Sequence, residues 1–258
     1  MHTTIEKLKA FEELLKIMNE LREKCPWDRE QTMESLRNLT IEETYELADA
    51  IIENDLEEVK KELGDLVLHV VFYSKLGEEK GVFDIADVLN GINKKLVFRH
   101  PHVFGEVKVN NSGEVVENWE HLKRKEGHRS VLAGVPDSLP AMIKANRVQE
   151  KVRAVGFDWD EPSQVWDKVE EEINELKDAI HTQNALDIES EFGDLLFSVI
   201  NAARLHGVDP ETALEKTNKK FIKRFLFLEK ETLHKGRELK DMTLDEMNEI
   251  WEDAKNFD

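Results

Sequence analysis

Residues 171–194, EEINELKDAIHTQNALDIESEFGD, decide the fold of this chain, because the same acidic pattern stands at residues 42–65, EETYELADAIIENDLEEVKKELGD. Both stretches begin with Glu-Glu-x-x-Glu. Fifteen residues then separate this motif from a second one, Glu-x-x-Asp. The two copies lie 129 residues apart in a chain of 258. An internal repeat of this length predicts two structural units of one design. We place these predicted domains at residues 1–128 and 129–258.

The overall composition predicts a globular protein with packed cores. Hydrophobic residues make up 40% of the sequence. The formal net charge of −19 argues against a nucleic-acid duplex as partner, because phosphate backbones bind basic surfaces. The single cysteine, Cys25, cannot form an intramolecular disulfide. The first residues contain no uninterrupted apolar stretch, so we expect no signal peptide, no membrane anchor and a cytoplasmic location.

Helical periodicity dominates the sequence and predicts an all-α fold. Each acidic copy is expected to span two consecutive helices. In the first copy these helices open near Thr40 and near Asn54-Asp55, and in the second they cover 163–181 and 185–206. Further helices are expected at 4–23, 84–98, 139–153, 210–235 and from Thr243 to about Trp251. Residues 105–140 are the expected linker, and a hairpin across 107–116 is the best place in it for any β-structure.

The carboxylates of the second copy are spaced to meet between two helices. Residues i, i+1 and i+4 of a helix fall within an arc of about 100°, so Glu171, Glu172 and Glu175 project to one side. Glu191 and Asp194 are neighbours on the following helix. If the two helices pack antiparallel, all five carboxylates converge. Because such charges repel each other, we expect a cation among them, and oxygen ligands favour Mg²⁺, with Mn²⁺ as a substitute.

The first copy offers a second candidate metal site with the same spacing. A glutamate-rich helix taken alone is ordinarily a solvated face. In this copy Thr40 followed by Glu43 also forms a potential capping box, which would assign Glu43 to a helix terminus. No cap accounts for Glu171 to Glu175, which are expected well inside their helix. We therefore favour the second copy as the working site. The candidate ligands of the first copy are Glu42, Glu43, Glu46, Glu62 and Asp65.

Basic, amide and aromatic residues repeat along with the carboxylates. Asn218, Lys220 and Arg224 have the spacing of Asn93, Lys95 and Arg99. A lysine and an arginine four residues apart on a helix can face one site and neutralise phosphate oxygens. Asn218 could bond a phosphate or a sugar, and Trp251 or Trp159 could stack on a base. These residues favour attack of a metal-activated water on a nucleoside triphosphate. Lys144, Gln149 and Lys151 precede the second copy alone and are candidates for extra substrate contacts.

The glutamate pattern resembles the signature of the all-α nucleoside triphosphate pyrophosphohydrolases. Its longer context is similar to the MazG family, over essentially the whole chain and in the two-repeat arrangement. The resemblance implies a helical bundle completed by homodimerisation, Mg²⁺ dependence, and hydrolysis of NTPs and dNTPs to the monophosphate and pyrophosphate as nucleotide-pool house-cleaning. It also implies that the second repeat is the main hydrolytic site. Besides the acidic copies, the motifs that carry it are Cys25-Pro26-Trp27-Asp28, Arg99-His100-Pro101-His102-Val103-Phe104 and Gly156-Phe157-Asp158-Trp159.

Two other classes of protein compete with this hypothesis. A di-iron carboxylate protein also collects glutamates from a helical bundle, but it uses Glu-x-x-His, and here the corresponding motif ends in aspartate. A non-catalytic, acidic, helical interaction protein of the stress response that keeps the fold would be expected to have lost carboxylates from one repeat. Neither repeat has lost any. The pyrophosphohydrolase therefore remains the favoured hypothesis.

Overall fold

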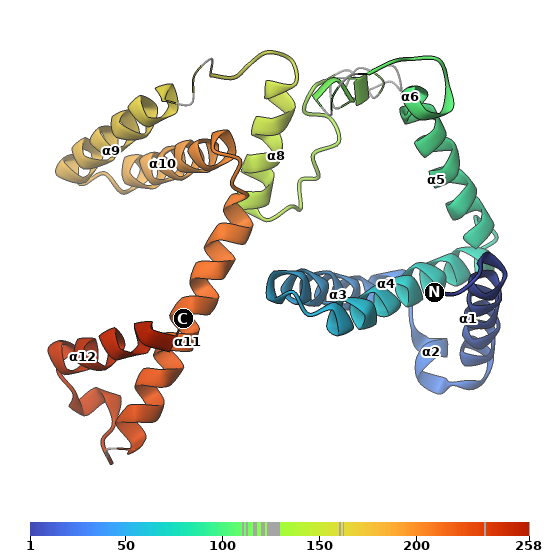
Figure 1. Cartoon of the computed structure of the whole chain (residues 1–258), viewed down its shortest axis with the longest axis horizontal. Coiled ribbons are helices and arrows are strands. Elements are labelled where there is room, and N and C mark those ends of the chain that lie inside the picture. Colours follow the sequence, from blue (N-terminus) through green and yellow to red (C-terminus); the bar gives the residue numbers. More distant parts are fainter. Residues whose placement is uncertain are drawn as a thin grey trace. The chain divides into compact units, whose positions relative to one another are not determined.

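The computed structural model describes residues 1–109, 111, 113–115, 118–119, 122, 130–159, 161, 163–234 and 236–257. All regular secondary structure within these residues is helical, which confirms the predicted all-α fold (Figure 1). The chain divides into two compact units, Met1–Asn110 and Asn111–Asp258. None of the helices in the described ranges combines the length and the apolar character that crossing a membrane requires.

The first unit is built around one pair of long helices. Helices α3 and α4 lie side by side and antiparallel, and α1 packs against α4 (Figure 1). The core between them is made of Met18, Leu36, Val71, Phe72 and Leu76. The described helices of this unit are α1 (Thr4–Lys24), α2 (Pro26–Glu30), α3 (Met33–Glu53), α4 (Leu56–Glu79), α5 (Ile85–Arg99) and α6 (Pro101–Phe104).

The second unit repeats this helix pair with different neighbours. Helices α9 and α10 lie side by side, α8 packs against α10 and α11, and α12 packs against α11. Val165, Val169 and Ala202 form a smaller core between α9 and α10. The described helices are α8 (Ala141–Arg153), α9 (Gln164–Thr182), α10 (Ala185–Leu205), α11 (Pro210–His234) and α12 (Leu244–Ala254), with 3₁₀ turns at Leu239–Asp241 and Lys255–Phe257.

The same turn joins the two helices of each pair. Asn54 ends α3 and Gln183 ends α9, both in the left-handed region at φ of 57° and 56°. The next residue caps the following helix: Asp55 accepts hydrogen bonds from the amides at the start of α4, and Asn184 accepts one at the start of α10. Because the turns match, the glutamates of both helices stand at corresponding heights in the two units.

Helix α3 begins earlier than predicted. Thr32 and Ser35 form the capping box at its start, so Glu43 lies ten residues inside the helix. The hydroxyl of Thr40 donates to the carbonyl of Leu36 and is no cap. The capping explanation for Glu43 is therefore wrong, which removes one reason for favouring the second copy over the first and leaves the family resemblance as a reason for it. The predicted hairpin across 107–116 is also wrong for the residues that the structure describes. Residues 107–109 are irregular and 113–115 are helical, whereas 110, 112 and 116 lie outside the described residues.

In each unit an arginine holds a motif that contains an aspartate, buried Asp28 in the first and half-buried Asp158 in the second. In the first unit the guanidinium of Arg22 bonds Glu79, with Nε 2.9 Å from Oε1, and donates to the backbone carbonyl of Asp28. In the second unit Arg204 makes a bidentate ion pair with Asp158, one arm of which is 3.0 Å long. Arg22 thus fastens the Cys25–Asp28 motif to α1 through a backbone carbonyl, and Arg204 fastens the Gly156–Trp159 motif to α10 through the carboxylate of Asp158.

Candidate metal centre

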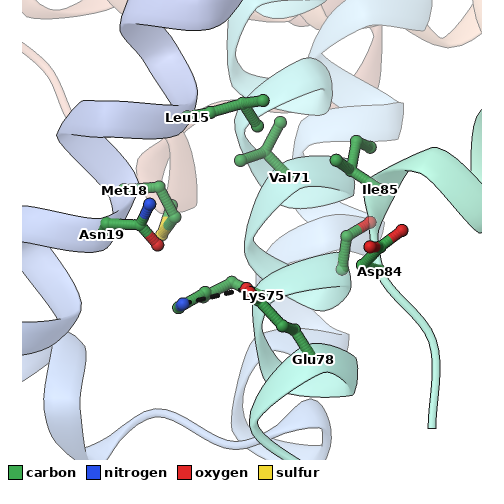
Figure 2. Close-up of a pocket in the computed structure, with 9 residues that line it drawn as sticks. Leu15, Met18, Asn19, Val71, Lys75, Glu78, Asp84 and Ile85 are labelled. Carbon is green, nitrogen blue, oxygen red and sulfur yellow. Dashed lines mark hydrogen bonds and ion pairs between the residues drawn. The ribbon is translucent and has the colours of Figure 1, made fainter. Parts of the chain in front are cut away.

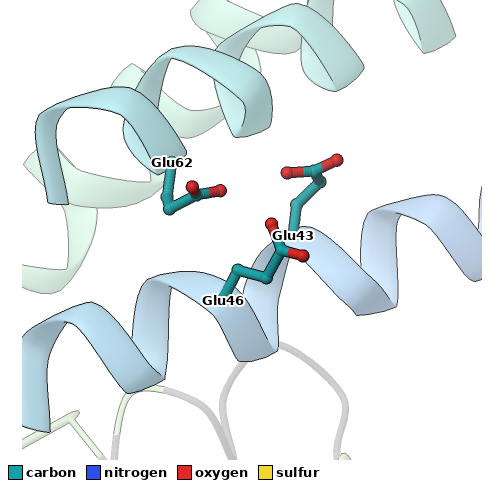
Figure 3. Close-up of side chains that lie close together, drawn as sticks. All are labelled: Glu43, Glu46 and Glu62. Atoms are coloured by element: carbon teal, nitrogen blue, oxygen red, sulfur yellow. The ribbon is translucent and has the colours of Figure 1, made fainter. Parts of the chain in front are cut away.

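The first carboxylate group lies between α3 and α4. Oxygens of Glu43, Glu46 and Glu62 all come within 4.8 Å of one another. Figure 3 shows the side chains of Glu43 and Glu46 rising from α3 toward Glu62 on α4. Glu62 is 1% exposed, and its Oε1 accepts a 2.9 Å hydrogen bond from Nζ of Lys61. Its Oε2 is buried and has no hydrogen-bond partner among the described residues.

The carboxylates of this group carry more negative charge than the neighbouring lysine neutralises. Burial, followed by the charge of Asp65, raises the pKa of Glu43. Burial, followed by the charges of Glu62 and Glu42, raises the pKa of Glu46. The hydrogen bond from Lys61 lowers the pKa of Glu62. Two of the three carboxylates therefore favour a bound proton or cation.

The second carboxylate group lies at the corresponding place between α9 and α10. Oxygens of Glu172, Glu175 and Glu191 come within 4.8 Å of one another. Nζ of Lys168 lies 2.7 Å from Oε1 of Glu172 and 2.9 Å from Oε1 of Glu171, which raises the pKa of the lysine. Burial, followed by the charge of Glu172, raises the pKa of Glu175.

Three of the five predicted carboxylates meet in each repeat. In the second repeat Glu171 pairs with Lys168, and Asp194 is exposed. In the first repeat Glu42 is exposed and Asp65 is half-buried. The helix spacing therefore predicted which face carries the charges, while the packing of the helix pair decides which oxygens come together.

The two groups bury opposite members of the same pattern. Glu62 on α4 is buried in the first group, whereas its counterpart Glu191 on α10 is half-buried. On the partner helices the order is reversed, because Glu172 is buried and its counterpart Glu43 is half-buried. The repeats are therefore alike in pattern and different in local environment.

Comparison with known proteins identifies the family. The MazG nucleotide pyrophosphohydrolase domain matches residues 31–104 and again 161–225, and each match contains one carboxylate group. The chain belongs to this family. It is 44% identical over 253 residues to the nucleoside triphosphate pyrophosphohydrolase/pyrophosphatase MazG of Thermotoga maritima, covering 96% of each chain. It is 41% identical over 259 residues to the nucleoside triphosphate pyrophosphohydrolase of Escherichia coli K12, covering 96% of this chain and 98% of the relative.

The match confirms two predictions made from the sequence. These are the family and the class of enzyme, a nucleotide pyrophosphohydrolase. It also confirms the two-repeat organisation, since the domain occurs twice. The predicted boundary between residues 128 and 129 stays a prediction.

The predicted nucleotide-binding residues of this MazG chain lie on other elements of the second unit. Arg224 on α11 lies over the ring of Trp251 on α12, 5.8 Å from its centroid, and Phe221 packs against the same ring at 4.9 Å. Asn218 and Lys220 are exposed on α11. Trp159, in the segment before α9, is 41% exposed. The structure thus assembles a cationic and aromatic face on α11 and α12, on different helices from the carboxylate group.

Three other residues that we considered as substrate contacts bond to the backbone. Nζ of Lys144 donates to the carbonyl of Asp137, at 2.6 Å. Nε2 of Gln149 donates to Phe197, and Nζ of Lys151 donates to Val131. These bonds fasten α8 to the segment before it and to α10, and the role of the three side chains in binding substrate stays a prediction.

Two lysines of the carboxylate groups were missed by the sequence reasoning. Lys168 stands four residues before Glu172, and Lys61 stands directly before Glu62. The first spacing is a recognised signal, because residues four apart on a helix are neighbours. The second carried no signal, since adjacent residues ordinarily point apart.

A cavity of the first unit lies away from these carboxylates. It has a volume of about 170 Å³ and lies between α1, α4 and the start of α5, where Met18, Val71 and Asp84 line it (Figure 2). Val71 stands nine residues after Glu62, which corresponds to about 13 Å along the helix. The cavity is therefore no part of the candidate metal centre.

Proposed function

We propose that this chain hydrolyses nucleoside triphosphates, both NTPs and dNTPs, to the monophosphate and pyrophosphate with Mg²⁺, which Mn²⁺ can replace. The observation that carries the proposal is the meeting of Glu172, Glu175 and Glu191 between two helices of a MazG domain. Removal of unwanted nucleotides from the cytoplasmic pool is the role that suits such a broad substrate class.

The donor set of the second group suits a hard cation. Its ligands are carboxylate oxygens alone, which Mg²⁺ and Mn²⁺ prefer to nitrogen or sulfur. The raised pKa of Glu175 marks charge that a cation would neutralise. We assign Glu172, Glu175 and Glu191 to the metal, with Glu171 and Asp194 completing its surroundings. A bound Mg²⁺ neutralises phosphate charge and lowers the pKa of water.

The residues of α11 and α12 are proposed to hold the nucleotide. Lys220 and Arg224 neutralise phosphate oxygens, and Asn218 bonds a phosphate or the sugar. Trp251 stacks on the base, and Trp159 is the second candidate for stacking. The contact of Arg224 with the ring of Trp251 supports this division, because it joins a phosphate-binding group to a stacking group.

A second copy of the chain is proposed to complete the bundle. The face of α10 next to Glu191 exposes Phe192, Leu196 and Val199, which are four and three residues apart and form one stripe. The same three positions of α4, after Glu62, expose Leu63, Val67 and Val70. Exposed apolar stripes of this kind mark interaction surfaces. We propose a homodimer that covers them.

Product analysis tests the proposed function directly. The chain is incubated with a panel of NTPs and dNTPs and Mg²⁺, and the products are separated. Pyrophosphate with the monophosphate is expected, whereas orthophosphate with the diphosphate contradicts the proposal. No product from any nucleotide favours the alternative, a non-catalytic or regulatory interaction protein.

Two substitutions locate the reaction. Glu175→Gln and Glu191→Gln each remove one metal-binding charge without changing size, and each is expected to lower kcat by about 100-fold or more with unchanged helical circular dichroism. Glu170→Gln is the matched control, because Glu170 is exposed on α9 outside the carboxylate group. Full activity in both test variants would remove the second group from the mechanism.

A further inference from the structure

Two histidine rings stand close together where α5 ends. Residues 100–102 read His-Pro-His, and the rings of His100 and His102 have centroids 5.6 Å apart and are tilted by 52°. His100 follows the last residue of α5, and His102 lies in the short helix α6 that comes directly after it (Figure 1). Neither the carboxylate groups nor the residues proposed to hold the nucleotide include these two side chains.

Hydrogen bonding defines the state of both rings. Nδ1 of His100 lies 2.6 Å from the backbone carbonyl oxygen of Leu96. Since a carbonyl oxygen only accepts, Nδ1 carries the proton, and the lone pair of the neutral ring is on Nε2. Nδ1 of His102 is buried, and no hydrogen bond reaches it within the described residues. A buried nitrogen without a partner is costly, so a ligand that binds it removes that cost.

We propose that His100 and His102 together bind one transition-metal ion of the Zn²⁺, Ni²⁺ or Co²⁺ class, with water completing the coordination. Imidazole nitrogen suits these ions, whereas Mg²⁺ prefers oxygen. A metal–nitrogen bond of about 2.0–2.1 Å places an ion about 3.2 Å from the centre of each ring, so two imidazoles on a tetrahedral ion have centres about 5.2 Å apart. The observed 5.6 Å is close to that separation.

The second nitrogen of His100 is supported as in other metal-binding histidines. A ligating imidazole usually donates its other N–H to a carboxylate, a water or a backbone carbonyl, which fixes the tautomer and the orientation of the ring. The bond from Nδ1 of His100 to the carbonyl of Leu96 is of this kind. It therefore leaves Nε2 as the nitrogen of His100 that binds the ion.

The backbone holds the two rings on one closed turn. Pro101 has a fixed φ, which restricts the link between them. The carbonyl of His100 accepts hydrogen bonds from the amides of Val103, at 2.9 Å, and Phe104, at 3.0 Å. The carbonyl of Pro101 accepts one from the amide of Gly105, and a Cβ at Gly105 would lie only 2.9 Å from that oxygen. Because the turn is already formed, the two imidazoles lose little freedom when they bind an ion.

The histidine pair belongs to the first repeat alone. The repeat that matches Arg99 with Arg224 places Phe-Leu-Phe, at 225–227, opposite residues 100–102. No proline stands there, so α11 continues to His234, whereas α5 ends at Arg99. The proposed site therefore goes beyond the proposed function, which uses oxygen ligands of the second repeat and Mg²⁺.

Binding of metal to single surface histidines is the competing account. His234 offers an ordinary case, because its side chain is 63% exposed and its Nδ1 lies 3.7 Å from Oε1 of Glu231. An ion held in this way depends on one imidazole only. The proposed site needs both rings at once, so loss of either histidine should have the same effect.

The test is titration of the full-length chain with Zn²⁺ in excess Mg²⁺, with free Zn²⁺ followed by a chromogenic indicator. Mg²⁺ competes for carboxylate oxygens and not for imidazole. His100→Gln and His102→Gln should each weaken the tightest Zn²⁺ site at least about 10-fold. His234→Gln is the matched control and should leave that site unchanged. Wild-type affinity in either of the two test variants would overturn the proposal.

A second measurement uses the wild-type chain and does not depend on the folding of any variant. The chain is labelled with nitrogen-15 in its histidines, and the ring signals are assigned through the adjacent backbone resonances. Zn²⁺ at one equivalent, again in excess Mg²⁺, should shift Nε2 of His100 and Nδ1 of His102 together, while Nδ1 of His100 stays protonated. Shifts confined to one of these rings, or appearing first at His234, would refute the pair. Pyrophosphate release in Mg²⁺ without Zn²⁺ reports on the proposed function alone.

Discussion

Asn54 and Gln183, 129 residues apart, hold the same left-handed backbone at the end of the first helix of each carboxylate-bearing pair. Asparagine tolerates this conformation because its short side chain bonds locally, whereas glutamine does not share that advantage. Both copies therefore have the same turn, but in the second copy it holds glutamine, which is strained in this conformation. The turn sets the height at which Glu43 faces Glu62 and Glu172 faces Glu191.

Gln183→Gly is expected to stabilise the second unit by up to about 1 kcal/mol, because glycine adopts the left-handed region without steric cost. Urea denaturation followed by circular dichroism measures the change. Asn54→Gly is the matched control and should alter the free energy of unfolding less. Destabilisation by Gln183→Gly larger than that by Asn54→Gly would show that the glutamine side chain makes a stabilising contact.

Protonated Glu175 should contribute to the stability of the metal-free chain, and this contribution should be lost as the pH rises past the ordinary carboxyl pKa of 4.5. Its pKa is raised in the folded state, so the folded chain binds more protons than the unfolded chain, and stability falls as the pH increases. The melting temperature in chelator should therefore fall from pH 4.5 to pH 7 more in the wild type than in Glu175→Gln.

Added Mg²⁺ should reverse this loss, since a cation takes the place of the proton. The rise in melting temperature on adding Mg²⁺ is expected to be larger at pH 7 than at pH 5, and smaller in Glu175→Gln than in the wild type. An equal rise in wild type and variant at both pH values would mean that the second group binds no cation.

Spacing alone predicted which side of each helix carries the glutamates, because that depends on the helical period. It failed where a side chain has a distant partner. Thr40 looked like a cap, but Tyr73 and His69, about thirty residues later, bring its hydroxyl into the helix pair. The spacing also gave no sign that Lys151 bonds the carbonyl of Val131, twenty residues earlier. Local pattern cannot reveal partners that only the packing brings near.

The same limit applies to the carboxylates themselves. Asp194 and Glu191 are equally placed by sequence, but only the oxygens of Glu191 join the group between α9 and α10. Which of two neighbours turns inward depends on how closely the helices pack and on which side chains fill the core beside them. The burial of Glu62 in one repeat and of Glu172 in the other follows from that packing.

Arg204→Ala should destabilise the second unit by about 3 kcal/mol, because it leaves the mostly buried Asp158 without its bidentate partner. Chemical denaturation measures the loss. Arg153→Ala is the control: Arg153 lies 3.6 Å from the same aspartate but is largely exposed, and its loss should cost under about 1 kcal/mol. Equal effects of the two substitutions would show that the buried pair does not fasten the Gly156–Trp159 loop.

Leu196→Lys should convert the proposed dimer to a monomer, because it places a charge in the middle of the exposed stripe of α10. Light scattering coupled to size-exclusion chromatography measures the mass. Leu186→Lys is the control, since Leu186 is 76% exposed in the first turn of α10 and lies outside the stripe. A wild-type monomer, or a dimer that survives Leu196→Lys, would remove the stripe from the interface.

Trp251→Ala should raise KM for a nucleoside triphosphate about 10-fold and change kcat less than about 2-fold, because stacking on a base contributes about 1–3 kcal/mol to binding. Trp251→Phe should keep most of the affinity, since phenylalanine also offers an aromatic face. Steady-state kinetics with two different bases measures both constants. Trp166→Ala, in a half-exposed tryptophan that bonds His206, is the control and should leave KM unchanged.

A purely structural role for Trp251 predicts a different pattern. Its ring packs against Phe221 and lies beneath Arg224, so loss of packing would lower the melting temperature and shift the position of α12. In that case Trp251→Phe and Trp251→Ala should both lower kcat and stability together. If Trp251→Ala raises KM alone and Trp251→Phe keeps the KM of the wild type, Trp251 recognises the base. Loss of packing against Phe221 would instead lower stability whether or not nucleotide is present.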